Sequence, residues 1–455
     1  MSRQSLPNGW SLASYCDVFL SASNGVGGKQ NKDGNGIPVS RIETIAEERI
    51  DYDRVGFLAN YDKSKVEKHL LLEGDILFSH INSPTHLGKT AIYTGEQVLY
   101  HGINLLRIVV NRKLVLPQLF NYHCKYIRAL GEFSSRAQHA VNQSSLNQKK
   151  LGEFEFPLPP LAEQKIIAEK LDTLLAQVET TKARLESTLE TLKQFRQSVL
   201  AAAVSGKLTT DWIGEREAWG KYALSELCRS VSDGDHQAPP RSDEGIPFLV
   251  ISNVSDGVIN FNTVTRWVPL DYYESLKSIR KPEKRDILYT VTGSFGIPVI
   301  VDTSKAFCFQ RHIAIIKPNH DKVNYKYLTL YLSSIEALRK AESVATGTAQ
   351  KTVSLTNLRK FVIPLPSREE QEEIVKRVEK ILAGADATEQ QVNQALERVN
   401  NLTQSILAKA FRGELTEQWR KENSDLISGD NSAEALLKKI KAERAAAKPK
   451  SKSKK

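Results

Sequence analysis

Polar loop segments carry the side chains of this chain that are best suited to chemistry at a ligand. Amides, guanidinium groups and hydroxyls donate and accept hydrogen bonds in fixed directions, which is how proteins read base edges in the DNA major groove. Ordinary surface loops have a similar composition, so a role in ligand binding is a hypothesis for each of these residues. The segments are 21–32, 79–89 and 134–145, then 232–241, 290–296, 310–312 and 346–352. The candidate residues are Asn24, Lys29, Ser79, His80, Asn82, Lys89, Arg136, Gln138, Asn142, Gln143, His236, Arg241, Thr292, Ser294, Gln310, Arg311, Thr348, Gln350 and Lys351.

The sequence shows no convincing signature of catalysis or metal binding. The methyltransferase tetrapeptide, Asn or Asp followed by Pro-Pro and an aromatic residue, does not occur, and the nearest string, APPR (238–241), fails at both ends. SPTHLGKT (83–90) resembles a phosphate-binding P-loop, but Ser83 stands where the first glycine must be. Cys308 and His312 are isolated, and no HExxH or ligand cluster appears. We therefore expect no catalytic residues and no metal site.

The bulk composition predicts a soluble, cytoplasmic, multidomain protein with a basic end. The chain has 455 residues, which is too long for one ordinary core. No run approaches the roughly 20 apolar residues of a membrane helix, no secretory signal is visible, and the four cysteines stand far apart, as reduced thiols do. Residues 438–455 contribute +8 of the net charge of +10. We interpret this end as a disordered, solvated tail that could add non-specific attraction to phosphates.

A long internal repeat organises the chain. Residues 157–212 align with 364–419 without a gap, and 20 of the 56 positions are identical. The segments before each copy also match faintly: GDILFSH (74–80) matches RDILYTV (285–291). These are short alternating apolar runs broken by Gly, Asn and Asp, which is typical of strands and turns. A repeat of this length predicts two similar structural units.

Each copy of the repeat predicts a long helix. Prolines start it, residues 161–205 contain no Gly or Pro, and Gly206 or Gly413 ends it. Apolar positions three and four residues apart form a seam over four heptads, which is typical of a coiled coil. The predicted seam residues are Ile167, Leu171, Leu174, Val178, Leu185, Leu192, Ile374, Val378, Ile381, Val392, Val399 and Leu402.

We therefore predict an α+β architecture, with two similar mixed α/β domains separated by two long helices. Because the termini of a domain usually lie close together, the helices should run antiparallel, with one domain at each end and a pseudo-twofold axis between the copies. The predicted boundaries are 1–156 for the first domain, 157–208 for the first helix, 209–363 for the second domain, 364–420 for the second helix and 421–455 for a C-terminal extension.

Two similar domains related by a twofold axis suit a bipartite target in duplex DNA, whose strands are antiparallel. The domains differ in sequence, so their half-sites should differ. The helices would then set the unread spacer between the half-sites.

Several stretches resemble the specificity subunits of type I restriction–modification systems, and especially their enterobacterial IA branch. They are PLPPLAEQKIIAEKLDTLLAQV (157–178), FRQSVLAAAVSGKLT (195–209) and NNLTQSILAKAFRGELTEQWR (400–420), which are similar to the conserved regions of the family. GDILFSH with LGKTAIY (87–93), and GTAQKTVSLTNLRKFVIPLP (347–366), are similar to its target-recognition domains. The resemblance covers essentially the whole chain.

This resemblance implies a non-catalytic DNA-recognition subunit of a bacterial restriction endonuclease and adenine methyltransferase complex. Its partners would be double-stranded DNA, two methylation subunits and two restriction subunits, without a membrane. This chain would bind no cofactor; S-adenosylmethionine belongs to the methylation subunits, and ATP and Mg to the restriction subunits. Two alternatives stay open: a stand-alone bipartite DNA-binding regulator without methyltransferase partners, and an enzyme such as a nuclease whose loose motif the sequence does not reveal.

Overall fold

The computed structural model describes residues 6–140, 143–213, 218–234, 239–255, 257–348 and 350–447. The chain divides into two units. The first contains residues 1–184 and 395–455, and the second contains residues 185–394. Each unit therefore combines one globular domain with part of both long helices.

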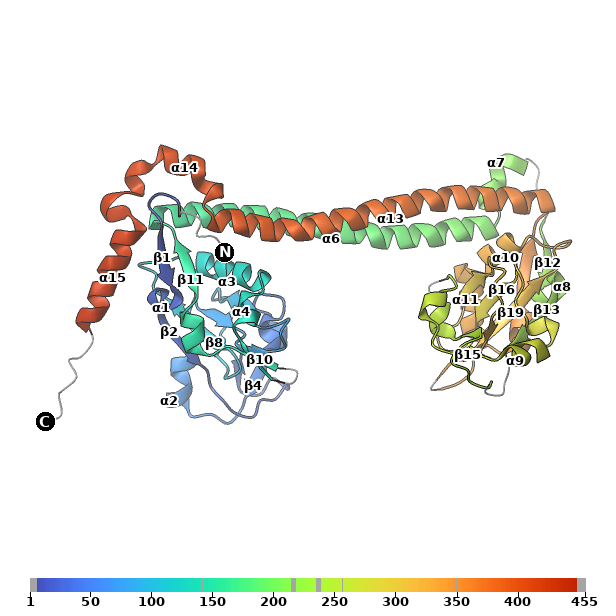
Figure 1. Cartoon of the computed structure of the whole chain (residues 1–455), viewed down its shortest axis with the longest axis horizontal. Helices are drawn as coiled ribbons and strands as arrows, with labels where there is room; N and C mark the ends of the chain where they lie inside the picture. The colour runs from blue at the N-terminus through green and yellow to red at the C-terminus, as the bar shows by residue number, and fades with distance from the viewer. Residues whose placement is uncertain are drawn as a thin grey trace. The chain divides into compact units, whose positions relative to one another are not determined.

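The first domain is built on a four-stranded antiparallel sheet with the order β2-β8-β5-β7. A separate pair, β1 and β11, joins the start of the domain to its end, with Ser11 opposite Leu158 (Figure 1). The main strands are β1 (Ser11–Ser14), β2 (Phe19–Asn24), β5 (Ile76–Phe78), β7 (Thr90–Ile92), β8 (Leu106–Val110) and β11 (Glu155–Leu158), and smaller sheets contain β3 (Ile37–Val39), β4 (Gly56–Leu58), β6 (Ile81–Asn82), β9 (Gln138–Ala140) and β10 (Gln143–Ser145). The helices are α1 (Tyr15–Val18), α2 (Lys63–Val66), α3 (Pro117–Ala129), α4 (Glu132–Ser135) and α5 (Gln148–Gly152).

The second domain repeats this layout. Its main sheet has the order β13-β19-β16-β17, and β12 pairs with β20 as β1 does with β11. The strands are β12 (Gly220–Ala223), β13 (Cys228–Asp233), β14 (Ile246–Leu249), β15 (Trp267–Val268), β16 (Ile287–Thr290), β17 (Pro298–Ile300), β18 (Cys308–Phe309), β19 (Ile313–Pro318) and β20 (Val362–Leu365). The helices are α7 (Thr210–Ile213), α8 (Leu224–Leu227), α9 (Leu270–Ser275), α10 (Tyr325–Leu332), α11 (Ile335–Val344) and α12 (Leu355–Arg359). The prediction of two like α+β domains is confirmed.

Both long helices form where the repeat predicts them. Helix α6 spans Leu161–Val204 and α13 spans Arg368–Phe411. Each ends at a glycine in the left-handed region, with φ of 76° at Gly206 and 77° at Gly413, where a side chain would be strained. The first unit contains the start of α6 with the end of α13, and the second contains the reverse. The two helices therefore pair in antiparallel directions.

The predicted seam residues are buried or half-buried, with one exception. Ile167 and Leu171 are fully buried in the core of the first unit, and Ile374 and Val378 are fully buried in the core of the second. Leu402, however, is 47% exposed, so its place in the seam is wrong. Near its end the buried face of α13 passes to Leu407, Ala410 and Phe411, which pack into the core of the first domain. Because this end of α13 packs on the first domain, its buried face no longer includes the heptad position of Leu402.

Each unit is closed by a buried carboxylate at the start of its own helix. In the first unit Glu163 accepts hydrogen bonds from Trp10 Nε1 (2.8 Å) and Thr416 Oγ1 (2.6 Å). In the second unit Glu370 accepts from Trp219 Nε1 (2.9 Å) and Thr209 Oγ1 (2.7 Å). Thr416 and Thr209 follow the ends of α13 and α6, respectively. We call these two arrangements the carboxylate clamps, because each attaches the end of one repeat to the domain of the other.

The C-terminal extension packs on the first domain. It contains α14 (Glu417–Glu422) and α15 (Ala433–Ala447), and Ala433, Leu437 and Ile440 of α15 join the first core. Arg444 also donates to the carbonyl oxygens of Cys16 and Phe19, at 3.2 and 2.6 Å. The predicted disorder is therefore wrong for residues 438–447, because they belong to a helix that Ala433, Leu437 and Ile440 anchor in the core and that Arg444 attaches to the first domain. Residues 448–455 lie outside the described part of the chain.

Candidate DNA interface

The two domains carry a cavity at the same position of the fold. In the first, Asn24 and Phe78 both lie opposite Leu106, while in the second Asp233 and Tyr289 both lie opposite Ala314. The equivalence continues beyond the strands, because Leu146 donates to the carbonyl of His80 and Val353 donates to that of Val291, both at 2.8 Å. We call these cavities the first and second recess.

The first recess has a volume of about 580 Å³. It opens where β2, β6 and β10 end, and α5 begins beside it. Its lining consists of Asn24, His80, Ile81, Leu106, Ser145, Leu146, Asn147, Gln148 and Lys149.

Hydrogen bonds fix the protonation pattern of this recess. The Asn24 amide Nδ2 donates to the carbonyl of Ile103 (3.1 Å), which fixes the orientation of the amide, and it also lies 3.2 Å from His80 Nε2. His80 Nε2 must then accept, so the proton of the neutral ring is on Nδ1. Burial lowers the pKa of His80 and keeps the ring neutral. Nδ1 is buried and has no hydrogen-bond partner within the described residues.

The second recess is smaller, about 350 Å³, and has a different lining. Thr352 donates from Oγ1 to Thr292 Oγ1 at 3.3 Å, which fixes the loop after β16 against the segment before α12. His312 has a lowered pKa because of its partial burial and the charge of Arg311 beside it. The lining residues are Asp233, Val291, Thr292, Arg311, His312, Gln350, Thr352, Val353, Ser354 and Leu355. Both recesses contain an imidazole and an amide, but only the second contains a guanidinium and a carboxylate, and only the first contains a lysine.

The structure brings five of the predicted DNA-binding residues into the recesses. Asn24 and His80 line the first, and Thr292, Arg311 and Gln350 line the second. The predicted residues do not include Asn147, Gln148, Lys149, Asp233 or His312, although the predicted loops 232–241 and 310–312 contain the last two. Aligning the two domains strand by strand would have found Asp233, because it is the counterpart of Asn24.

Other predicted residues lie elsewhere. Lys89 donates to the carbonyl of Ala46 at 2.6 Å, and Arg136 pairs with Glu132 and lies 4.6 Å from the centre of the Phe154 ring. Ser79 is buried and accepts a hydrogen bond from Asn82. Lys29, Gln138, Arg241, Ser294, Thr348 and Lys351 are exposed, and Gln310 is half-buried. Asn142 and His236 lie outside the described residues, as does the side chain of Gln143.

The described residues contain no group of three His, Cys, Asp or Glu side chains placed to hold a metal ion. Burial raises the pKa of the thiols of Cys124, Cys228 and Cys308, which keeps them protonated and poorly nucleophilic. Among the helices that the structure describes, none is long and apolar enough to cross a membrane.

Comparisons with known proteins agree with this architecture. Residues 8–191 and 216–398 each match the type I restriction modification DNA specificity domain. The chain is 44% identical over 349 residues to the EcoBI specificity subunit of Escherichia coli, covering 72% of each chain, and 36% identical over 460 residues to the EcoKI specificity subunit of E. coli strain K12, covering 98% of each. Two solved structures share the fold. One comes from a study of complex assembly in the type I R-M system (TM-score 0.71, 21% identity, 90% of this chain and 100% of that one), and the other is the HsdS subunit from Thermoanaerobacter tengcongensis (TM-score 0.55, 20% identity, 91% and 99%).

The family domain thus matches each of the two repeated halves of the chain once, and each half contains one recess. A relative that is more than one third identical covers nearly the whole length. This chain therefore belongs to the specificity subunits of type I restriction–modification systems, the subunits that recognise DNA.

Proposed function

We propose that each domain reads one half of a split, asymmetric DNA target, while the long helices set the number of unread base pairs between the halves. The observation that carries this proposal is the pair of recesses, which occupy one position of the fold and differ in almost every polar side chain. A duplicated fold with different side chains at the same place is what two different half-sites require.

The side chains around the recesses suit base edges. In the first recess, the exposed amide of Gln148 has the donor and the acceptor that bind adenine at two atoms. In the second, Arg311 has the planar fork that binds guanine at two atoms, and Asp233 is an acceptor for an exocyclic amine. The exposed Lys149 and Lys351 are suited to phosphate contacts, which position the protein without specifying sequence.

The chain itself does no chemistry in this proposal. As the family resemblance implies, two methylation subunits dock on the helices and carry S-adenosylmethionine, and two restriction subunits use ATP and Mg. The methylation subunit must turn its target adenine out of the helix, and the recognition domain places that base within reach. The complex works in the bacterial cytoplasm.

Single-molecule methylome sequencing of a host strain with and without this gene tests the proposal. We expect a split motif with methylated adenine on both strands, which is lost on deletion. Replacing residues 1–156 with another recognition domain should change one half of that motif and leave the other half and the spacer intact. A motif that changes in both halves would contradict the assignment of one domain to one half-site.

If deletion changes no methylation, a pull-down for a methyltransferase partner separates a missing partner from a free-standing DNA binder.

A further inference from the structure

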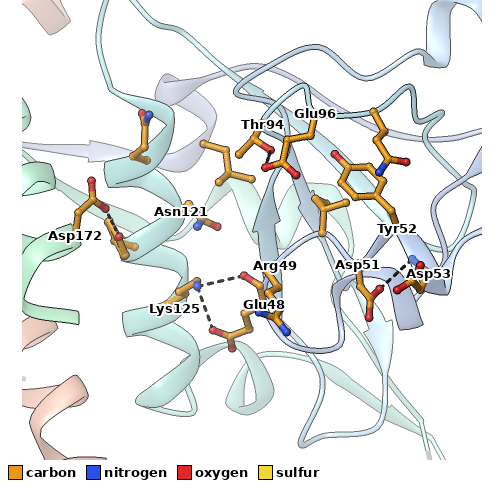
Figure 2. Close-up of a pocket in the computed structure, with 15 residues that line it drawn as sticks. Glu48, Arg49, Asp51, Tyr52, Asp53, Thr94, Glu96, Asn121, Lys125 and Asp172 are labelled. Atoms are coloured by element: carbon orange, nitrogen blue, oxygen red, sulfur yellow. Dashed lines mark hydrogen bonds and ion pairs between the residues drawn. The ribbon is translucent and has the colours of Figure 1, made fainter. Parts of the chain in front are cut away.

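A large groove in the first unit lies apart from both recesses. Its first part has a volume of about 710 Å³ and lies between residues 48–53, the turn after β7, helix α3 and Asp172 of α6 (Figure 2). A second part of about 900 Å³ shares Glu48, Arg49, Tyr122, Lys125 and Asp172 with the first. It continues along the paired helices past Leu175, Glu179 and Gln404. We call the first part the acidic groove, because the second part is also lined by Lys89, Arg128 and Lys182.

Negative charge dominates the first part of the groove. Its lining contains the carboxylates of Glu48, Asp51, Asp53, Glu96 and Asp172 against the cations Arg49 and Lys125. This local excess of acid occurs in a chain with a net charge of +10. The groove therefore repels DNA phosphates and attracts cations.

Part of this charge is already neutralised, and the rest is available. Lys125 Nζ lies 3.5 Å from the carboxylate of Glu48, and Arg128 pairs with the same carboxylate. Asp51 pairs with Arg54 at 3.1 Å. Within the described part of the chain, Asp53 and Glu96 form no ion pair, and both are exposed on the wall of the groove.

Two buried polar atoms in the groove lack partners. Asn121 is only 6% exposed, and its carboxamide oxygen has no hydrogen-bond partner within the described residues. The hydroxyl of Tyr52 is buried without one as well. Figure 2 shows Asn121 on α3, in the space between Lys125 and the wall that carries Thr94 and Glu96. An unpaired buried acceptor reduces stability, so its position in an acidic cavity indicates a ligand that brings donors.

The wall beside these residues is built to keep its shape. Glu48 has a φ of 56°, in the left-handed region that non-glycine residues seldom adopt. The Nζ of Lys125 donates to the backbone carbonyl of Glu48 at 3.3 Å, in addition to its contact with the carboxylate. The strained turn is thus anchored on α3 from two sides, and the groove is formed before any ligand arrives.

We propose that the acidic groove binds an arginine-bearing segment of a protein partner, with a guanidinium group beside Glu96 and Asn121. A guanidinium is planar, carries five donors and retains its charge when partly buried. These properties match the carboxylate of Glu96, which accepts from Thr94 Oγ1 (3.0 Å) but has no cation partner among the described residues, and the buried amide oxygen of Asn121. The size of the groove excludes a lone cation as the natural occupant. Its continuation along α6 and α13 provides room for a chain segment. The inference does not depend on how the recesses read DNA.

The test measures binding of a short fluorescein-labelled peptide of glycine, serine and arginine to the full chain by fluorescence anisotropy. The same peptide with citrulline in place of arginine keeps the hydrogen-bonding shape and removes the charge. The double variant Asp53→Asn, Glu96→Gln should bind the arginine peptide about tenfold more weakly. The matched control is Glu153→Gln, Glu155→Gln, which removes two exposed carboxylates of the same unit outside the groove and should bind like the unchanged protein.

A further variant separates a binding role of Asn121 from a structural one. Asn121→Leu removes the unpaired acceptor at similar volume, so we expect weaker peptide binding together with an unchanged or higher unfolding temperature. A lower unfolding temperature would indicate that the amide serves the fold. The proposal would be overturned if the citrulline peptide bound equally well, if both double variants behaved alike, or if the unchanged protein bound neither peptide.

Because peptide binding needs neither DNA nor methylation, a failure of the proposed DNA reading leaves this result unaffected.

Discussion

The carboxylate clamp of the first unit makes a quantitative prediction about Arg420. Its guanidinium pairs with Glu163, whose side chain is fully buried, and itself is 11% exposed. It also donates to the carbonyl of Gly413 at 2.6 Å and lies 5.9 Å from the centre of the Trp10 ring. Arg420→Met keeps the apolar stem of the side chain and removes the charge, so it leaves Glu163 buried without its cation.

Removing one partner of a buried ion pair costs about 3–5 kcal/mol. Trp10 and Thr416 still donate to Glu163, which places the expected cost at the lower end, about 3 kcal/mol. For a unit of about 245 residues, each kcal/mol lowers the unfolding midpoint by about 2–4 °C. The midpoint of the first unit should therefore fall by about 6–12 °C.

Thermal unfolding followed by hydrogen exchange and mass spectrometry assigns the change to one unit. Lys421→Met is the matched control, because Lys421 pairs with Glu417 on the surface, where the two side chains are 66% and 62% exposed. That pair is worth less than about 1 kcal/mol. Equal losses in the two variants, or a loss spread over both units, would refute the reasoning. Adding Glu163→Gln to Arg420→Met should recover part of the stability, because it removes the unpaired charge.

Three further predictions concern acid, the C-terminal helix and the second recess. Burial lowers the pKa of His101 to about 4 and of His123 to about 3. The unfolded chain therefore binds protons near pH 6.5 that the folded first unit does not, and its stability falls below that pH by about 2 kcal/mol per histidine by pH 5. Urea unfolding at pH 7 and 5 measures the loss, and His101→Leu should reduce it. Deleting residues 428–455 removes the buried Leu437 and Ile440 and should destabilise the first unit by about 4 kcal/mol, while exchange in the second unit stays unchanged. Arg311→Gln should relax sequence choice in one half-site by about 1–3 kcal/mol, which methylome sequencing detects as a degenerate position in that half alone.

The sequence predicts the long-range organisation well because the repeat records it directly. The helix ends at Gly206 and Gly413 can be predicted because glycine adopts a positive φ without strain, which a helix end of this kind requires. The seam fails at Leu402 because the spacing of apolar residues does not reveal which surface they face. After that point, from Leu407 onward, α13 packs into the core of the first domain.

The candidate site was harder to predict for a related reason. Lys89 lies in a segment with the composition expected of a DNA-facing loop, yet its ammonium group donates a hydrogen bond to the carbonyl of Ala46. Asp233 and Gln148 line the recesses only because strands far apart in the sequence end at one place. Pairing between strands decides such meetings, and a single sequence does not contain that pairing explicitly.

The carboxylate clamps also set an order of folding during synthesis. The second unit is a continuous stretch, residues 185–394, so all of it leaves the ribosome before the end of α13 does. The first unit needs residues from 395 onward, including Thr416 and the buried face of α15. At about 5–20 residues per second, its first 184 residues wait about 10–40 s for the segment that completes them. The domain that is made first is therefore finished last, and during that interval its core side chains around Ile167 and Leu171 remain open to chaperones and to aggregation.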